Sequence, residues 1–394
     1  IFVGTMSALT QDDSKRLMSF HVIGQIGYMF LGIGLGVFLL PVNPPLATIA
    51  LISGIFHLLN HTMYKSCLFL NAGSILYQTG ARDLNKVGGL MRLMPFTAVT
   101  AIIASLSIAG IPPFSGFASK LLIFESSIMS EVSSPLFIIL GLVAIFISAV
   151  TLASFLKFLN SAFLGKLYTE SGVNIHGDVP LTMKIPQGVL AFLCILFGVV
   201  PLLPVRIIYH AVSSILPANY SPAAGSILGG MLPGLSLNFG QGKFGAWNPL
   251  WILIAIIVLF ALGYLISRAG KAPIRKAETW YGGREHAAED VRYVSHSFYN
   301  PFKRIFAFTI AGVKFEGLYP KAIYLPKITM PRTLKALFDL DRWLYYPFTS
   351  GFVKLSRRFS RVHVGIPQVY ILWIIIGVIA AILVFFALPV GVGK

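Results

Sequence analysis

The chain has 394 residues, of which 56% are hydrophobic and only 11% are charged. Soluble domains carry about 25% charged residues, so this composition excludes an ordinary soluble protein and indicates one that crosses a membrane repeatedly. Its 31 Lys and Arg outnumber 14 Asp and Glu, but 18 of these basic residues lie between Arg268 and Arg361. This clustering next to apolar runs is typical of a cytoplasmic loop, not of a nucleic-acid-binding domain.

Long apolar runs predict the membrane spans. The first run, Ile1 to Leu9, is shorter than the roughly 20 residues that a span needs, so we expect a truncated first helix. We then expect seven full spans: Ser19–Leu40, Pro45–Tyr77, Met94–Met129, Ser134–Leu159, Gln187–Ile215, Pro249–Ser267 and Val369–Leu388. The predicted fold is an all-α polytopic membrane protein.

The span Met94–Met129 is too long for one straight crossing. Near its middle, the stretch Ala109–Gly116 contains Gly110 and the pair Pro112-Pro113. Proline removes a backbone donor and glycine loosens a helix, so this stretch predicts two half-helices joined by a non-helical segment. Broken helices in transporters mark ion sites.

Loops that contain several basic residues alternate along the chain with loops that contain few or none. Because basic loops stay on the cytoplasmic side, this predicts that Gln11–Met18 and the large basic segment are cytoplasmic and that Lys394 is extracytoplasmic. Five regions follow from the pattern: a core at 1–160; further spans at 161–268 with an extracytoplasmic loop at 218–248; a basic cytoplasmic segment at 269–332; an amphipathic lateral helix at 333–366; and an anchoring span at 367–394.

The lateral helix is predicted from apolar residues that recur at helical spacing between Thr333 and Val362, with Lys and Arg among them. Such a basic amphipathic helix lies on a membrane surface. Anionic lipids are its expected electrostatic partner.

Three ionisable residues, His57, His61 and Lys65, follow one another at intervals of four inside the second span. On a helix this spacing places them along one face. They are either two structural histidines with a lysine that reaches the membrane surface, or the lining of a polar route for protons or cations. Ionisable groups in hydrocarbon are costly and usually functional, which favours the second interpretation.

Other ionisable residues are weaker candidates. Lys120 follows the predicted break, and Glu125 is either its partner or an interfacial acid. On spacing alone Lys15 is an ordinary loop residue, and His21 and Lys157 are structural or accessory. The sequence has no nucleotide-binding, zinc-protease or cysteine-cluster motif, so we expect no cofactor and no metal site.

Several stretches resemble a known family. "SALTQDDSKRLMSFHVIGQIGYMFLGIG", "IFHLLNHTMYKSCLFLNAGSI", "DLNKVGGLMRLMPFT" and "IAGIPPFSGFASK" are similar to antiporter-like subunits of respiratory complex I, Mrp-type cation/proton antiporters and membrane-bound NiFe hydrogenases. "AEDVRYVSHSFYNPFKRIF" and "GIPQVYILW" resemble the large antiporter-like subunit of formate hydrogenlyase, hydrogenase-4 and archaeal membrane-bound hydrogenase or sulfur-reductase complexes.

By this resemblance, a set of basic residues matches the central hydrophilic axis and the outlet-side half-channel: Lys15, His57, His61, Lys65 and Lys120. Lys120 would exchange protons with the outside. The chain would begin within the second of two inverted five-helix repeats, with no counterpart for the first repeat's Glu–Lys pair. The lateral helix and the last span would clamp neighbouring subunits.

The expected function is translocation of protons, or of sodium and protons, by a membrane subunit of a redox-driven respiratory or hydrogenase complex in a prokaryotic cytoplasmic membrane. Its partners would be other membrane subunits, including other antiporter-like ones, and any redox site would belong to them. Two alternatives are an Mrp-type sodium/proton antiporter subunit without a redox partner and a non-conducting scaffold.

Overall fold

The computed structural model describes residues 1–130, 135–165, 167–169, 177–216, 228–229, 236–237, 248–270 and 293–299, together with Pro347, Ser350, Gly351 and Lys354. The chain divides into two units, Ile1–Phe306 and Ala307–Lys394. Apart from these four single residues, the predicted lateral helix and anchoring span lie outside the described residues, as do most of 218–248 and 269–332.

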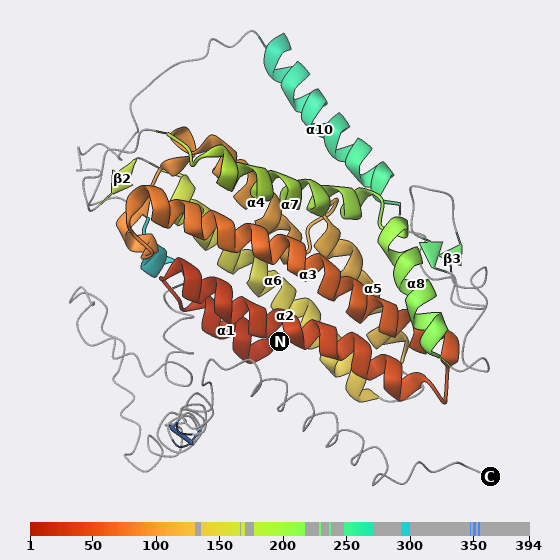
Figure 1. Cartoon of the computed structure of the whole chain (residues 1–394). Coiled ribbons are helices and arrows are strands. Elements are labelled where there is room, and N and C mark those ends of the chain that lie inside the picture. Colours follow the sequence, from red (N-terminus) through yellow and green to blue (C-terminus); the bar gives the residue numbers. More distant parts are fainter. Residues whose placement is uncertain are drawn as a thin grey trace, which may run out of the picture. The chain divides into compact units, whose positions relative to one another are not determined.

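The described part of the first unit is almost entirely helical (Figure 1). Its α-helices are α1 (Phe2–Leu9), α2 (Ser14–Leu39), α3 (Pro44–Thr79), α4 (Pro95–Ala109), α5 (Ser115–Met129), α6 (Pro135–Phe163), α7 (Leu181–Val199), α8 (Leu202–Ile215) and α10 (Pro249–Ala269). Short 3-10 turns are η1 (Leu84–Lys86), η2 (Leu90–Arg92) and η4 (Ser295–Ser297). Two-residue strands form two antiparallel pairs, β1 (Val87–Gly88) with β2 (Tyr168–Thr169) and β3 (Leu228–Gly229) with β4 (Ser236–Leu237).

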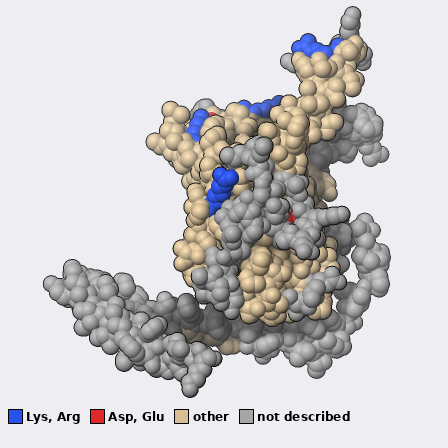
Figure 2. Space-filling view, turned by 90° about the vertical axis from the view of Figure 1, so that its right-hand side faces the viewer, with Lys and Arg blue, Asp and Glu red and all other residues tan. Residues whose placement is uncertain are grey.

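Within the described residues, five helices are long and apolar enough to cross a membrane: α2, α3, α6, α7 and α10. Their lipid-facing character is visible in large apolar side chains left exposed, such as Phe30 at 69% and Phe146 at 55%. Figure 2 shows one face on which the described residues are almost all uncharged, with Lys and Arg confined to a few separate patches. A multi-pass membrane protein is therefore confirmed.

The predicted break in the third span is confirmed. Helix α4 ends at Ala109, where Gly110 adopts a left-handed conformation with φ of 79°, and α5 begins at Ser115. Glycine tolerates this conformation because it has no Cβ, and it closes α4 in the usual C-terminal manner.

The prediction of one span over Gln187–Ile215 was wrong. The structure has two helices there, because α7 ends at Val199 and α8 begins at Leu202. Pro201 lies between them, and proline cannot donate the backbone hydrogen bond that would carry α7 onward. The apolar run continues across this break, so composition alone did not reveal it.

Helix α3 lies in the middle of the bundle and packs against α2, α4, α5, α7 and α8. Its contact with α2 is close because glycines face each other: a Cβ on Gly32 would lie 2.8 Å from the backbone nitrogen of Gly54. Small residues let membrane helices approach closely. This packing buries the middle of α3, where the predicted row of ionisable residues is.

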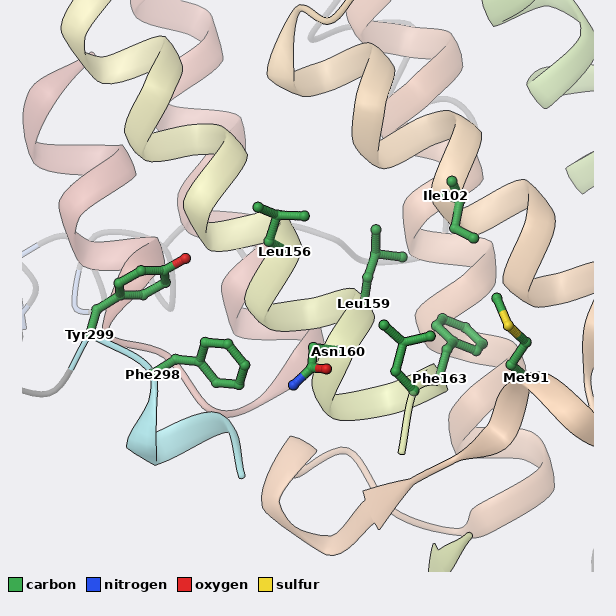
Figure 3. A pocket seen from close by; sticks show the side chains of 9 residues that line it. Met91, Ile102, Leu156, Leu159, Asn160, Phe163, Phe298 and Tyr299 are labelled. Carbon is green, nitrogen blue, oxygen red and sulfur yellow. The ribbon is translucent and has the colours of Figure 1, made fainter. Parts of the chain in front are cut away.

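The segment containing η4 packs on the loops at the C-terminal end of α3. Ser295 donates a hydrogen bond to Asp12 at 2.7 Å, and the backbone nitrogen of His296 donates to Asn85 at 2.9 Å. Beyond η4, Phe298 and Tyr299 line an apolar pocket of about 410 Å³ with side chains of α4, α6 and the loop at η2 (Figure 3). None of the predicted site residues lines this pocket.

Candidate functional site: a buried row of basic side chains

Lys120 lies in the second turn of α5, and its side chain, which is 1% exposed, reaches back to the break between α4 and α5. Its ammonium donates hydrogen bonds to the carbonyl of Ile108 at 2.8 Å and to the hydroxyl of Ser148 at 3.0 Å. The last carbonyls of a helix have no partner within the helix and carry partial negative charge. The break therefore supplies the groups that solvate a buried cation.

Two neighbours complete the surroundings of Lys120. The ring of Tyr28 lies 4.8 Å from its ammonium, a distance at which an aromatic face attracts a cation. Tyr28 is itself fixed by a 2.7 Å hydrogen bond to the carbonyl of Ala144, and Ser148 by one of 3.0 Å to the carbonyl of Ala109. Helices α2, α4 and α6 thus all contribute to the position of this lysine.

His57 connects Lys120's helix with α2. Its Nδ1 lies 2.9 Å from the hydroxyl of Ser119, and its Nε2 lies 3.1 Å from the side-chain oxygen of Gln25. The hydroxyl of Tyr64 donates to the same Gln25 oxygen at 3.3 Å. His57 is fully buried, and both of its ring nitrogens have a polar neighbour. Ser119 is the residue directly before Lys120, so this contact joins His57 to the helical turn that carries the lysine.

His61 and Lys65 continue the row along α3. Both are buried, at 8% and 4% exposure. Among the described residues, His61 Nε2 and Lys65 Nζ have no hydrogen-bond partner. The Lys65 ammonium lies between the rings of Phe69 and Phe155, at 5.8 and 5.7 Å from their centroids. Unpaired buried groups of this kind destabilise a fold, which indicates that they are retained for a role other than stability.

His21 and Lys157 extend the row beyond Lys65. The ring of Phe155, which faces Lys65, also packs on His21 with centroids 4.7 Å apart. His21 Nε2 lies 2.8 Å from the hydroxyl of Ser154. Lys157 is fully buried and donates to the carbonyl of Leu9, at 2.8 Å, and to that of Gln11. The row of Lys120, His57, His61, Lys65, His21 and Lys157 is called the basic row below.

Two predicted residues are not connected to the basic row. Lys15 is half-buried in the first turn of α2, next to an ion pair of 2.9 Å between Asp13 and Arg82. Its side chain makes no hydrogen bond or ion pair with the described residues. Glu125 is half-buried on α5, and within the described part of the chain it forms no ion pair with Lys120.

The neutral members of this site were not predicted from the sequence. Gln25 and Tyr28 lie four and seven residues after His21 on α2, a helical spacing that could have been recognised. Ser148 offered no such signal, because its contact with Lys120 joins residues 28 positions apart in the chain.

The fold and the basic row define a polytopic membrane protein with ionisable side chains in its interior. The family model described as NADH:quinone oxidoreductase/Mrp antiporter, TM, matches residues 1–148. This match includes α1 to α5 and the break that holds Lys120. Over residues 1–148 the chain has the sequence of the antiporter-like membrane subunits of this family, as its motifs predicted.

Individual proteins of known name are also similar to this chain. The chain is 30% identical to formate hydrogenlyase subunit 3 of Escherichia coli (strain K12) over 318 residues, 78% of this chain and 48% of that protein. It is 36% identical to one of the subunits of the Na(+)/H(+) antiporter of Alkalihalophilus pseudofirmus over 225 residues, 54% of this chain and 28% of that protein. The chain thus spans about half the length of these relatives, or less.

A solved relative covers nearly the whole chain. It belongs to the membrane-bound sulfane sulfur reductase, an archaeal respiratory membrane complex. The two chains are 28% identical, with a TM-score of 0.67 over 97% of this chain and 54% of the other.

Proposed function

We propose that this chain translocates protons, or exchanges sodium ions for protons, as a membrane subunit of a redox-driven complex. The observation that carries the proposal is the position of Lys120, a buried cation held by backbone carbonyls at a helix break. Within the described residues it has no acidic partner. A buried cation without a counter-ion gives up its proton more readily than one fixed in an ion pair.

The rest of the basic row gives the proton a route. Lys65 and Lys120 are both buried next to aromatic rings, where the field of a charge is weakly screened. A charge that arrives on one member therefore disfavours charge on its neighbours, so proton entry at one end promotes release at the other. Histidine suits the intermediate positions, since its charge changes near neutral pH.

The redox-driven assembly is supported by the relatives that are parts of formate hydrogenlyase and of an archaeal sulfur reductase. The partners would be other membrane subunits, with anionic lipids next to the basic segment. The bacterial and archaeal relatives favour a prokaryotic cytoplasmic membrane as the location, and the loop charges favour an orientation with that segment inside and the C-terminus outside. The similarity to sodium/proton antiporter subunits supports the second candidate, an antiporter without a redox partner.

The test is proton pumping by the assembled native complex in proteoliposomes. Lys120→Met should abolish pumping while the complex still assembles, because methionine keeps the side-chain volume and removes the charge. Lys184→Met, at the start of α7 and outside the basic row, is the matched control and should pump normally. Normal pumping by Lys120→Met in an intact complex would refute the proposal, and sodium-dependent pumping would favour the antiporter.

A further inference from the structure

A second set of buried polar side chains lies on the opposite side of α3 from Lys65, between α3, α4 and α7. Its outer layer contains Asn71, Ser74, Thr100 and Gln187, each no more than 3% exposed. Gln187 donates to Ser74 at 2.8 Å, and the Thr100 hydroxyl lies 3.0 Å from the Asn71 oxygen. None of these residues carries a charge, unlike the basic row.

An inner layer lies closer to the helix break. The hydroxyls of Ser107 and Ser115 are 3.0 Å apart, and Asn60 donates to the carbonyl of Ser115 at 2.9 Å. Cys194 of α7 is fully buried and lies near both serines. The side-chain oxygen of Asn60 is buried and has no hydrogen-bond partner within the described part of the chain.

The two layers are related by a spacing of seven residues on α4 and α7. The pairs are Thr100 and Ser107 on α4, and Gln187 and Cys194 on α7; on α3, Cys67 lies seven residues from Asn60. Seven residues are two helical turns, or about 10.5 Å, so the layers are stacked along the helix axes.

The helix faces between the layers carry small side chains. Ala104 of α4 and Ala191 of α7 are buried there, at 0% and 3% exposure. Next to them, the Cys67 thiol lies 3.8 Å from the carbonyl of Thr100 and 3.7 Å from that of Gln187. At Ala104 and Ala191, α4 and α7 place small side chains between the polar layers. We call the two layers together with Cys67 the neutral column.

Each end of the neutral column meets a charged group. At the outer end the half-buried Asp178 accepts from the Thr97 hydroxyl at 2.6 Å, and the carbonyl of Thr97 lies 3.0 Å from the Thr100 hydroxyl. At the inner end, Ser107 directly precedes Ile108, whose carbonyl accepts from Lys120. The column thus leads from the loops at the start of α4 and α7 to the surroundings of Lys120.

We propose that the neutral column is a second path for protons, which move on water molecules between Asp178 and Lys120 without passing through His57 or Lys65. This proposal rests on the function proposed above. Hydroxyls and amides bind water but do not hold a proton themselves, so water is the carrier. Polar side chains also join membrane helices, but helix joining alone does not explain an unpaired amide oxygen next to the break.

The native thiol of Cys67 reports water in the column directly. The experiment uses the assembled complex in sealed membrane vesicles, in a Cys194→Ala background, with a small membrane-impermeant methanethiosulfonate added from one side. Such reagents attack thiols that reach water. The matched control is Leu68→Cys in a background without Cys67 and Cys194, because Leu68 is as buried as Cys67 and adjacent on α3, in the same apolar cluster, but on a face turned by about 100° from it.

We expect Cys67 to react at least tenfold faster than the control thiol from the side on which Asp178 lies. Equal rates, or reaction of neither thiol, would overturn the column as a water path. Thr100→Val, which removes one hydroxyl at nearly constant volume, should slow both the labelling of Cys67 and proton pumping several-fold. Slower labelling with unchanged pumping would show that the column carries water but not protons, and would also overturn the proposal.

The two proposals fail in different ways. Labelling of Cys67 does not require turnover, so it remains measurable in Lys120→Met. If Lys120→Met stops pumping and Cys67 is unreactive, the function stands and the neutral column is structural. If Cys67 reacts rapidly but Lys120→Met pumps normally, the role of Lys120 is wrong, and with it the end point of the second path.

Discussion

Lys120 donates a hydrogen bond of 2.8 Å to the carbonyl of Ile108, across the break that separates their two helices. This contact explains why the break and the lysine occur together. An unbroken helix would pair this carbonyl with a backbone nitrogen one turn later, and the ammonium would be left among apolar groups. The site therefore depends on backbone geometry as much as on the identity of the lysine.

Gly110→Ala tests this dependence. Its left-handed backbone, with φ of 79°, disfavours alanine, and the added Cβ would lie 3.0 Å from Cδ of Lys120. We expect a loss of stability of about 1–2 kcal/mol and a several-fold loss of pumping. Gly80→Ala is the control, because its φ is 70° and nothing lies within 4 Å of the new Cβ. It should lower stability by a similar amount, measured by thermal unfolding, and leave pumping intact. Equal pumping by the two variants would contradict this role of Gly110.

Ser148→Ala removes the side-chain hydroxyl that Lys120 contacts at 3.0 Å. The ammonium then loses one of its polar neighbours in a buried site, so we expect pumping to fall several-fold with assembly unchanged. Ser126→Ala is the matched control, since its hydroxyl bonds only to carbonyls of its own helix. If both variants pump equally well, Ser148 does not support the charge on Lys120.

How far the sequence predicts this site depends on the residue. The four-residue spacing of His57, His61 and Lys65 indicates one helix face, and the structure buries all three. Gly110 and the proline pair predict the break. Spacing along one helix does not show which side chain of another helix a residue contacts. The contact between Lys120 and Ser148 could therefore not be predicted from the sequence. The break at Pro201 was missed because apolar residues continue on both sides of it.

Gln25→Leu tests the link between His57 and Tyr64. The Gln25 oxygen lies 3.1 Å from one and 3.3 Å from the other, so leucine removes a shared acceptor at similar volume. We expect slower pumping because His57 loses the group that orients its ring. Tyr64→Phe removes the 3.3 Å contact with Gln25 and a 3.4 Å contact with His57 but leaves the shorter contact between His57 and Gln25, so it should have a smaller effect in the same pumping assay. The reverse order of effects would contradict the link through Gln25.

Gly198→Ala tests whether α7 holds the break in place. A Cβ at Gly198 would lie 2.0 Å from the carbonyl oxygen of Pro113 and 2.6 Å from the backbone nitrogen of Ser115, so α7 touches the backbone of the break directly. Backbone atoms cannot move aside as a flexible side chain does. We expect a loss of stability of roughly 3 kcal/mol, seen as a lower melting temperature of the complex and a lower yield.

The control for this variant is Gly263→Ala on α10, where nothing lies within 4 Å of the new Cβ. In an open helix position alanine is favoured over glycine by about 0.5–1 kcal/mol, so this variant should be neutral or slightly stabilised. A melting temperature of Gly198→Ala equal to that of Gly263→Ala would mean that α7 does not press on the break. In that case α7 could move away from α4 and α5 without cost, and the position of Lys120 would have to be maintained by α2 and α6 through Tyr28 and Ser148.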